Sequence, residues 1–216
     1  MVVKFGARSV QGSLRRHPRN IAQSGLVMPH EIVADTTFPS DYEFELLEGW
    51  PAKSEFPNEY IFKCGSGAGS EFMALRVSSP NSATWLGVFQ QEYGTPPAIS
   101  RVYTCPKRTD LCVISGGKGY VIDIRDPNKY QELRCFPVTS AITSLQTKQI
   151  VFADFTRLLC LDEFGIRWIS ESACWDEAKI IGIDGGQVRC SGWAYYDILF
   201  NVDLQTGEIS DSRPKA

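Results

Sequence analysis

Histidine is missing from almost the whole of this chain. Its two histidines, His17 and His30, both lie within the first 30 of the 216 residues. Catalysis by a Ser-His-Asp triad or a Cys-His pair needs a histidine beside the nucleophile, and most zinc sites use histidine as a ligand. The sequence after residue 30 therefore excludes those catalytic classes and nearly all histidine-based zinc sites. We predict no catalytic residue and no metal site.

Long hydrophobic runs are also missing. No apolar run approaches the ~20 residues that a membrane-spanning helix needs. The first residues, Met1–Phe5, lack the apolar core of a secretory signal. Hydrophobic residues make up 43% of the chain, and the mean hydropathy is −0.16. We therefore expect a soluble protein with one domain and no membrane partner.

The cysteines show no metal or redox spacing. There are seven of them, an odd number, and no two are arranged as C-x-x-C. Cys112, Cys160 and Cys190 lie inside strand-like phrases rich in Val, Ile and Leu, where cysteine acts as a small buried hydrophobe. This pattern favours a reducing compartment without a disulfide framework, and we expect a cytoplasmic protein.

Charge is divided unevenly along the chain. Five of the 22 basic residues and none of the 25 acidic ones lie in residues 1–30, which leaves 17 basic and 25 acidic residues, a net charge of −8, in the rest. An acidic body argues against a nucleic-acid partner. The basic leader has three interpretations: a transit peptide, a disordered tail, or a start codon assigned too early, with Met28 as the natural beginning. Because residues 1–20 carry no amphipathic stripe, we expect 1–30 to be a disordered leader and 31–216 a single β-repeat domain.

The main positive feature is a phrase of strand, tight turn and second strand ending in aspartate, which recurs three times. The copies are Leu111–Asp123, Ile150–Asp162 and Val188–Asp203, and their closing aspartates lie 39 and 41 residues apart. A period near forty with four short strands per period is typical of propeller blades. The predicted fold class is all-β, with about four repeated antiparallel four-stranded units in a small β-propeller or propeller-like array. A β-sandwich is the alternative.

Each of the three later repeats divides into four strands, separated by Gly, Asn or Asp turns that tolerate positive φ. The predicted strands are Ile99–Thr104, Asp110–Ile114, Gly119–Ile124 and Lys129–Leu133; Ile142–Leu145, Gln149–Ala153, Arg157–Leu161 and Ile166–Ile169; and Lys179–Ile183, Gln187–Ser191, Asp197–Asp203 and Glu208–Ser210. Residues Glu59–Phe89 have the same strand and turn order without the aspartate, and we predict that they form a divergent first blade. Tyr42–Leu47 alternates as a strand does, although its Glu and Leu residues also suit a helix.

Four units leave the closure of the array open. A first strand near Ile32 would complete the last blade in a closed or nearly closed array, which we favour. In an open arc, exposed sheet edges would need a cover or would pair with a second copy as an oligomer.

The aspartates that close the repeated phrases have two interpretations. Asp123, Asp162 and Asp203 would either line one rim and bind a cation, or cap their own turns by accepting backbone N–H bonds. Their repetition at equivalent turns favours capping, and Asp154 is predicted to cap a turn as well. Two glycine-rich stretches, residues 65–70 and 115–119, resemble phosphate loops, but each links strand-like segments without a following helix. We therefore predict hairpin loops and no cofactor.

Aromatic side chains gather near the last predicted hairpin. Trp85 and Trp168 are expected to pack between blades, whereas Trp193-Ala-Tyr-Tyr lies on a hairpin at one end of the array. Exposed Trp and Tyr residues are common anchors of protein interfaces. An exposed interface and a loop folded over the core remain equally open. The candidate partner-binding residues are Trp175, Trp193, Tyr195 and Tyr196.

Two resemblances follow from these phrases. Asp162–Trp168 and Asp203–Glu208 resemble the outer hairpins of quinoprotein-like and WD-type propellers, and this resemblance covers about residues 97–210. The last third is similar to a group of uncharacterised bacterial proteins. The recurring phrases are Ala153–Thr156, Gly165–Trp168, Asp184–Gly186, Gly192–Trp193 and Phe200–Gly207. The second resemblance implies a soluble bacterial cytoplasmic protein and no particular activity.

Two functional hypotheses lead, and a third, a structural repeat with no partner of its own, stays open. The first is a non-enzymatic binding module for a protein partner, for which an immunity-type inhibitor of a basic toxin would suit the acidic charge. The second is a small-ligand binder, or a hydrolase or lyase, that uses carboxylates such as Asp123 and Asp154 on the central face of a propeller. It predicts a pocket with convergent carboxylates of raised pKa.

Overall fold

The computed structural model describes residues 32–47, 49, 58–63, 72–91 and 98–214, without the side chains of 211–214. All of them belong to one compact unit, residues 31–216. The predicted leader, residues 1–30, lies outside the described residues. The described part is built of strands and turns, and it holds no helix that would be long and apolar enough to cross a membrane.

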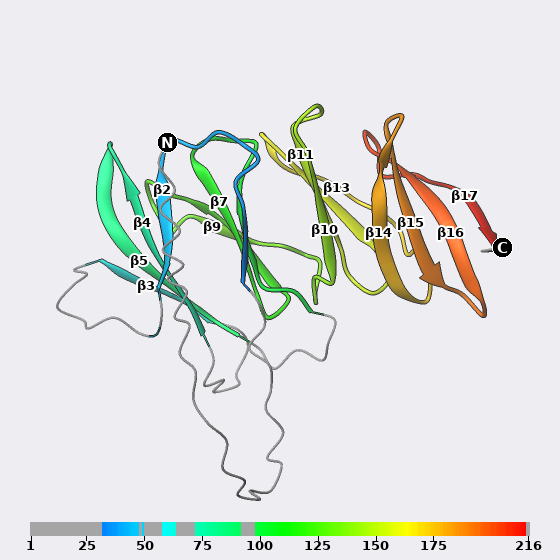
Figure 1. Ribbon diagram of the computed structural model, residues 1–216, viewed down its shortest axis with the longest axis horizontal. Helices are drawn as coiled ribbons and strands as arrows, with labels where there is room; N and C mark the ends of the chain where they lie inside the picture. Colours follow the sequence, from blue (N-terminus) through cyan, green and yellow to red (C-terminus); the bar gives the residue numbers. More distant parts are fainter. Residues whose placement is uncertain (1–31, 48, 50–57, 64–71, 92–97, 215–216) are drawn as a thin grey trace, which may run out of the picture. The chain divides into compact units, whose positions relative to one another are not determined.

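Four sheets make up the described part of the chain, and Figure 1 shows them side by side. Sheet I has the strand order β2 (Glu43–Leu47), β4 (Phe72–Ser79), β5 (Ser82–Gln90) and β3 (Glu59–Phe62). Sheet II has the order β1 (Val33–Asp35), β6 (Arg101–Thr104), β7 (Asp110–Ser115), β8 (Lys118–Asp123) and β9 (Tyr130–Glu132). Sheet III consists of β10 (Ser140–Ser144), β11 (Gln149–Ala153), β12 (Leu158–Asp162) and β13 (Gly165–Ile169). Sheet IV consists of β14 (Asp176–Asp184), β15 (Gln187–Trp193), β16 (Asp197–Asp203) and β17 (Ile209–Pro214).

Sheets III and IV are antiparallel meanders, as the repeated phrases predict. Strands β11 and β16 have the predicted bounds, and the other strands of the three later units differ from prediction only at their ends. The β11–β12 register pairs Ile150 with Leu161, and the β15–β16 register pairs Val188 with Val202. The turns come where Gly and Asp were expected to allow them. The fold is therefore an all-β, propeller-like array, and its four packed sheets exclude a two-sheet sandwich.

The first strand was predicted to complete the last blade, and this prediction is wrong. Strand β1 pairs in parallel with β6, with Val33 opposite Arg101, and so it lies at the edge of sheet II. Because only a short segment links β1 to β2, β1 stays beside the sheets formed by the residues that follow it in the chain. Sheet IV takes its fourth strand from β17 instead.

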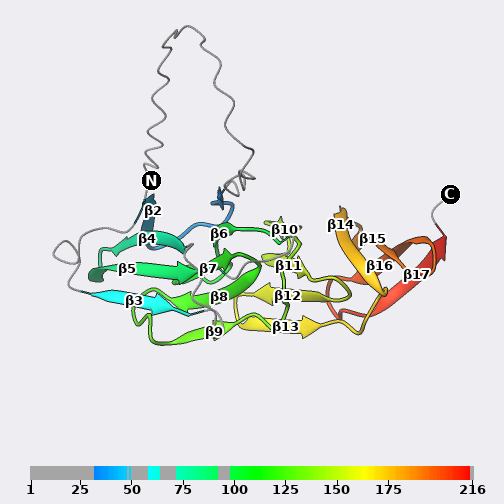
Figure 2. The same cartoon turned by 90° about the horizontal axis from the view of Figure 1, so that it is seen from below.

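Sheet I is the divergent blade. Its β2 segment, which suited either a strand or a helix, is a strand, because Phe44 and Leu46 on its alternate positions pack against the core shared with sheet II. In the other sheets, the last strand in the chain forms the outer edge. In sheet I, this edge is formed instead by β3, which precedes β4 in the chain and pairs in parallel with β5. Figure 2 shows β3 and β9 at matching edges of neighbouring sheets.

Three hydrophobic clusters fill the spaces between consecutive sheets. One joins sheets I and II, the next joins II and III, and the third joins III and IV. Strands β11 and β12 are buried along their full length because both of their faces are covered. Trp85 and Trp168 pack in these layers as predicted, and their indole N–H groups donate to the carbonyls of Ile124 and Leu204 at 3.1 and 3.0 Å.

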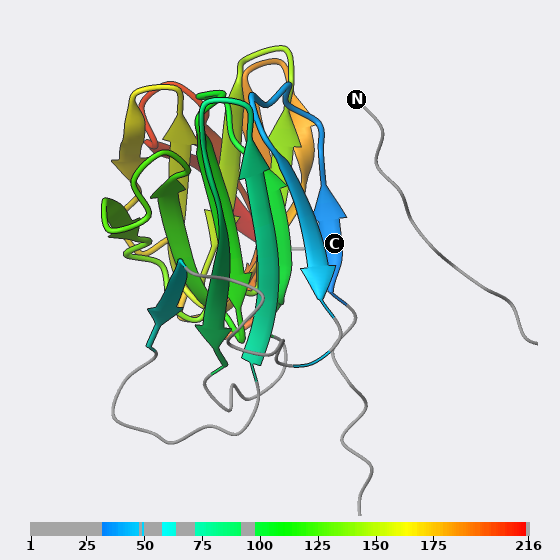
Figure 3. The same cartoon turned by 90° about the vertical axis from the view of Figure 1, so that its left-hand side faces the viewer.

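The array does not close through a core between its ends. Among the described residues, no hydrophobic cluster joins sheet I to sheet IV. Along β15 and β16 burial alternates: Val188 and Cys190 face sheet III, whereas Arg189 and Trp193 face outward. Sheet IV thus ends the series with a largely polar outer face, as the terminal units of repeat arrays do. Among the described residues, the expected closed or nearly closed array is replaced by an open series of sheets, and Figure 3 looks along this series from the sheet I end.

Candidate functional site

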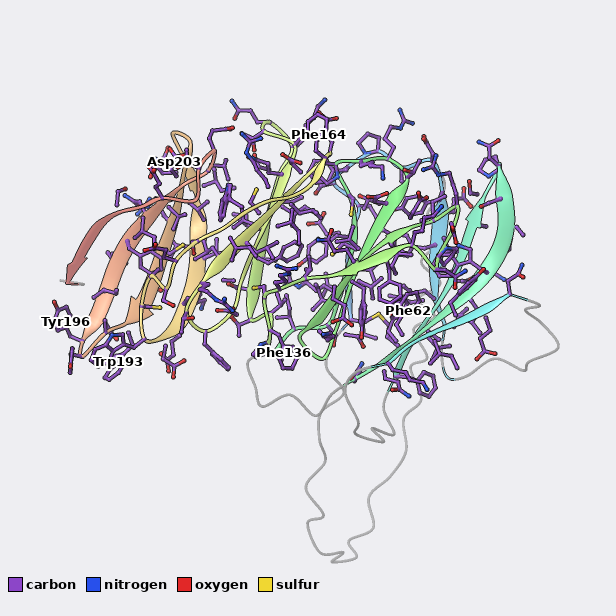
Figure 4. The ribbon with its side chains drawn as sticks, turned by 180° about the vertical axis from the view of Figure 1, so that it is seen from behind. Phe62, Phe136, Phe164, Trp193, Tyr196 and Asp203 are labelled. Atoms are coloured by element: carbon purple, nitrogen blue, oxygen red, sulfur yellow. The ribbon has the colours of Figure 1, made fainter. Side chains whose placement is uncertain are left out.

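At one end of sheet IV, the ring of Trp175 contacts two other rings of the predicted partner-binding set. The Trp175 and Tyr195 ring centroids lie 3.8 Å apart with an interplanar angle of 60°, and those of Trp175 and Trp193 lie 6.0 Å apart at 69°. Tyr196 follows in the same β15–β16 hairpin, and Figure 4 shows it beside Trp193 at the end of the sheet. We call these four residues the aromatic end surface.

The aromatic end surface is open to solvent. The exposed fractions are 54% for Trp175, 40% for Trp193, 75% for Tyr195 and 54% for Tyr196. A loop folded over the core would bury most of this area, whereas among the described tryptophans only Trp85 and Trp168, which lie on strands in the layers between sheets, are buried. The structure therefore places all four predicted residues on the surface and brings three of them into ring contact.

Backbone hydrogen bonds hold the two segments of this surface together. Trp175 N–H donates to the Trp193 carbonyl at 2.8 Å, and Ala194 N–H donates to the Tyr196 carbonyl at 2.9 Å. Tyr195 occupies the turn of this hairpin with a φ of 62°, and its ring lies against Trp175. The rings are therefore carried on a paired backbone rather than on a loose loop.

The connection before β14 is anchored to sheet III. Ala173 and Ala178 donate their N–H groups to the carbonyls of Thr156 and Phe155 at 2.8 and 2.9 Å, in the β11–β12 turn. Between them Cys174 is buried and its thiol lies against Gly192 of β15. Trp175 is thus fixed between two sheets. This packing brings it to Trp193, although seventeen residues separate the two tryptophans in the sequence.

Carboxylates surround the aromatic end surface. Asp176 and Asp197 are the cross-strand neighbours of Trp193, on β14 and β16, and so they lie on the same sheet face. Glu177 follows directly after Asp176, and all three side chains are exposed. None of them takes part in an ion pair with another described residue. The surface therefore presents aromatic faces next to carboxylates that no described Lys or Arg side chain neutralises, although Asp176 Oδ1 accepts from Glu177 N at 2.7 Å.

The three repeated aspartates cap their turns, as predicted. Asp123 Oδ1 accepts from Arg125 N at 3.1 Å, and Asp162 Oδ1 accepts from Phe164 N at 2.8 Å. Asp203 Oδ1 accepts from the N–H groups of Gln205 and Thr206, both at 2.8 Å. Within the described ranges, no three His, Cys, Asp or Glu side chains are grouped so that they could hold a metal ion.

The carboxylates of the enzyme hypothesis are engaged in local structure. Arg125 hydrogen bonds to Asp123 and lowers the pKa of that carboxyl from its ordinary value. Asp154 is 3% exposed, accepts from Thr156 N and Arg157 N at 2.8 Å each, and pairs with the Arg157 guanidinium. Asp154 therefore caps its turn, as predicted. The lowered pKa of Asp123 is the opposite of the raised pKa that a general acid at neutral pH would need.

The six described cysteines are buried and reduced. Burial raises the pKa of Cys160 and of Cys190 to about 12, and it also raises the pKa of Cys135. Thiols of this kind are packing residues, as predicted for Cys160 and Cys190, because the reactive form is the thiolate. Cys64 lies outside the described residues.

Of the two glycine-rich stretches, residues 65–70 lie outside the described residues. The second is the β7–β8 turn, as predicted, in which Gly116 and Gly117 adopt φ of 55° and 81°. Gly117 has a second role, because a Cβ there would lie 2.7 Å from the Pro137 Cβ. The segment that carries Pro137 therefore packs directly on this turn.

A surface pocket of about 490 Å³ lies at the junction of sheets II and III and was not predicted from the sequence. Its lining residues are Lys118, Gln131, Glu132, Leu133, Arg134, Phe136 and Arg157. The alternation Leu133-Arg-Cys-Phe136 is the available signal, because buried Leu133 and Cys135 leave Arg134 and Phe136 outside. That Arg157 joins them from another sheet is not visible in the sequence.

Comparisons with known proteins identify no family. No family model matches the chain, and no curated protein matches it. One similar solved structure is a crystal structure of a nidogen/laminin complex, with 12% identity over 67% of this chain and 59% of that chain, at a TM-score of 0.38. Another is BamB from Moraxella catarrhalis, with 11% identity over 67% of this chain and 49% of that chain, at a TM-score of 0.41. This chain covers between about half and three fifths of those two chains, and likenesses at this level say nothing about the site.

Proposed function

We propose that this protein is a non-enzymatic binding module that holds a protein partner with a basic surface. The observation that supports the proposal is the aromatic end surface together with Asp176, Glu177 and Asp197 beside it. Its occupant is a folded partner whose Lys and Arg residues face these carboxylates.

The chemistry of the surface suits such a partner in two ways. Trp and Tyr offer a large contact area at low conformational cost, since each side chain has only two rotatable χ angles. The unpaired carboxylates would attract basic side chains, and an arginine placed over an indole face gains a cation–π contact as well. The Trp175 and Tyr195 rings already touch, so a cation would lie on their exposed faces and not between them.

An immunity-type inhibitor of a basic toxin remains the specific form of this proposal. It is supported by the net charge of −8 outside residues 1–30. We propose a cytoplasmic location because the described cysteines form no disulfide and because the last third resembles a group of bacterial proteins. An enzyme that uses Asp123 and Asp154 has less support, because both carboxylates are occupied by arginine and turn N–H groups.

The test is affinity capture from native lysate with the full chain and with the double variant Trp193→Ala, Tyr195→Ala. The control variant is Phe164→Ala, which removes an 89% exposed ring at the opposite end of the strands (Figure 4). The captured protein is identified by mass spectrometry, and its dissociation constant is then measured with purified components.

We expect the wild type and Phe164→Ala to capture the same protein, which has a basic surface. We expect the double variant not to capture it. Truncating two aromatic anchors should weaken binding by about a hundredfold, and raising the salt concentration should weaken it further. Equal capture by the double variant and the wild type would place the interface elsewhere. Capture of an acidic partner, or an affinity that does not change with the salt concentration, would contradict the proposed role of the carboxylates.

A further inference from the structure

The pocket between sheets II and III carries a local excess of positive charge. Lys118, Arg134 and Arg157 line it, and Glu132 is the only acidic residue of the lining. This contrasts with residues 31–216 as a whole, in which acidic residues outnumber basic ones by 25 to 17. Three cationic heads around one concavity are a site for an anion, because their mutual repulsion is relieved when a negative group binds.

The pocket floor is a rigid platform. Leu133 N–H donates to the Gly119 carbonyl and Val138 N–H donates to the Gly117 carbonyl, both at 2.9 Å. Leu133 and Cys135 are buried in the core between sheets II and III. Because side chains alternate along an extended segment, Arg134 and Phe136 both project outward into the pocket. Figure 4 shows Phe136 at this edge of the sheets.

Arg134 is the free cation of the site. It forms no ion pair or hydrogen bond with another described residue, although it is exposed at the pocket. Lys118 pairs with Glu132, and Arg157 pairs with Asp154, whose carboxylate is buried behind the pocket. A guanidinium without an internal partner keeps its five donors for a ligand, and its planar fork suits a phosphate or carboxylate.

Phe136 adds an apolar side to the pocket. Its ring is 44% exposed, while its neighbours Leu133 and Cys135 are buried. A flat apolar group would pack on this ring while its charged end faced Arg134. The volume lies within the range of small-molecule sites, which is about 300–1,000 Å³.

From this arrangement we infer that the pocket binds a small phosphate monoester with a flat apolar group. The phosphate contacts the Arg134 guanidinium and the charged ends of Lys118 and Arg157, and the apolar group lies against Phe136. A phosphate is favoured over a monocarboxylate because it has more acceptor oxygens, and so it can accept from the Arg134 guanidinium and from a second cationic group of the lining at the same time. This site is separate from the aromatic end surface and does not depend on the function proposed for it.

The experiment is a titration of the full chain with phenyl phosphate, inorganic phosphate and phenol, followed by calorimetry and by amide chemical shifts. Arg134→Ala is the test variant, and it should fold normally because Arg134 has no internal partner. Arg189→Ala is the matched control, since Arg189 is an exposed arginine without a described partner on the outer face of sheet IV. Phe136→Ala tests the apolar contact.

Phenyl phosphate is expected to bind more tightly than inorganic phosphate, and phenol is expected not to bind. Arg134→Ala should weaken phenyl phosphate by about tenfold or more, as expected for a lost charge-assisted hydrogen bond, while Arg189→Ala leaves it unchanged. Phe136→Ala should remove the advantage of phenyl phosphate over inorganic phosphate. No saturable binding, or equal losses in the two arginine variants, would overturn the inference. Equal affinity for the two phosphates would overturn the role of Phe136.

Discussion

The thiol of Cys174 lies directly over the backbone of Gly192. A Cβ built at position 192 would be 2.7 Å from the Cys174 Sγ and 2.8 Å from its Cβ. Only glycine leaves room for this approach, which seats the connection before β14 against β15. Trp175 follows Cys174 and Trp193 follows Gly192, so this contact sets the spacing of the two indole rings.

Replacing Gly192 should therefore damage both stability and the aromatic end surface. Gly192→Ala is expected to lower the free energy of unfolding by about 1–3 kcal/mol, because the added methyl overpacks a site that the Cys174 side chain fills. Urea unfolding measures this change, and Trp fluorescence reports the rings. Gly182→Ala is the control, because a Cβ there meets no atom within 4 Å. Equal stability of the two variants would contradict the proposed packing role.

Asp154 should be the most sensitive of the turn aspartates. Its Oδ1 accepts two backbone N–H bonds from a buried position, so Asp154→Ala leaves both donors without that partner. We expect a loss of about 1–3 kcal/mol in the free energy of unfolding. Asp154→Asn should cost less, because the amide oxygen replaces Oδ1 and only the pairing with Arg157 is lost. If Asn were as damaging as Ala, the ion pair would matter more than the cap.

The pH dependence of stability should include a contribution from Asp203. The N–H groups of Thr206 and Gln205 lower the pKa of this carboxyl below its unfolded value. A depressed folded pKa stabilises the protein above the unfolded pKa, and this stabilisation is lost as the pH falls through the folded pKa. Stability measured by urea unfolding should therefore decline below about pH 4.

The variant Asp203→Asn separates this contribution from the rest. Its amide oxygen can still accept the two N–H bonds, but it does not titrate, so the decline below about pH 4 should be shallower than in the wild type. Asp123→Asn should act similarly, because Arg125 lowers the pKa of Asp123. An unchanged acid limb in both variants would show that other carboxyls control it.

The buried thiols should resist alkylation in the folded protein. Burial raises the pKa of Cys160 and Cys190 to about 12, and so their thiolate fraction near pH 8 is very small. Mass spectrometry after iodoacetamide treatment should find both residues unmodified in the native state and modified in urea. Rapid native modification of Cys190 would mean that sheet IV opens locally.

Most of the strands could be predicted because their signals are local. Alternating or continuous apolar residues between Gly and Asp turns located β11 and β16, and short-range geometry lets Asp123 and Asp203 cap the turns that follow them. The exposure of Trp193 was an open choice in the sequence, since a hairpin of the same composition can project or fold back. In the structure the hairpin projects and Trp193 contacts Trp175. That contact depends on packing between sheets III and IV.

By itself the sequence determined the all-β class, the repeating strands, the capped turns and the buried cysteines, because each depends on side-chain alternation or on residues a few positions apart. The tertiary structure alone decided three features: the parallel edge pairing of β1 and β3, the open end at sheet IV, and the meeting of Arg134 with Arg157. The pairing of an edge strand depends on which neighbouring strand has unpaired backbone groups. The lining of a pocket depends on which sheets pack next to each other. Both are long-range outcomes of packing that no local pattern encodes.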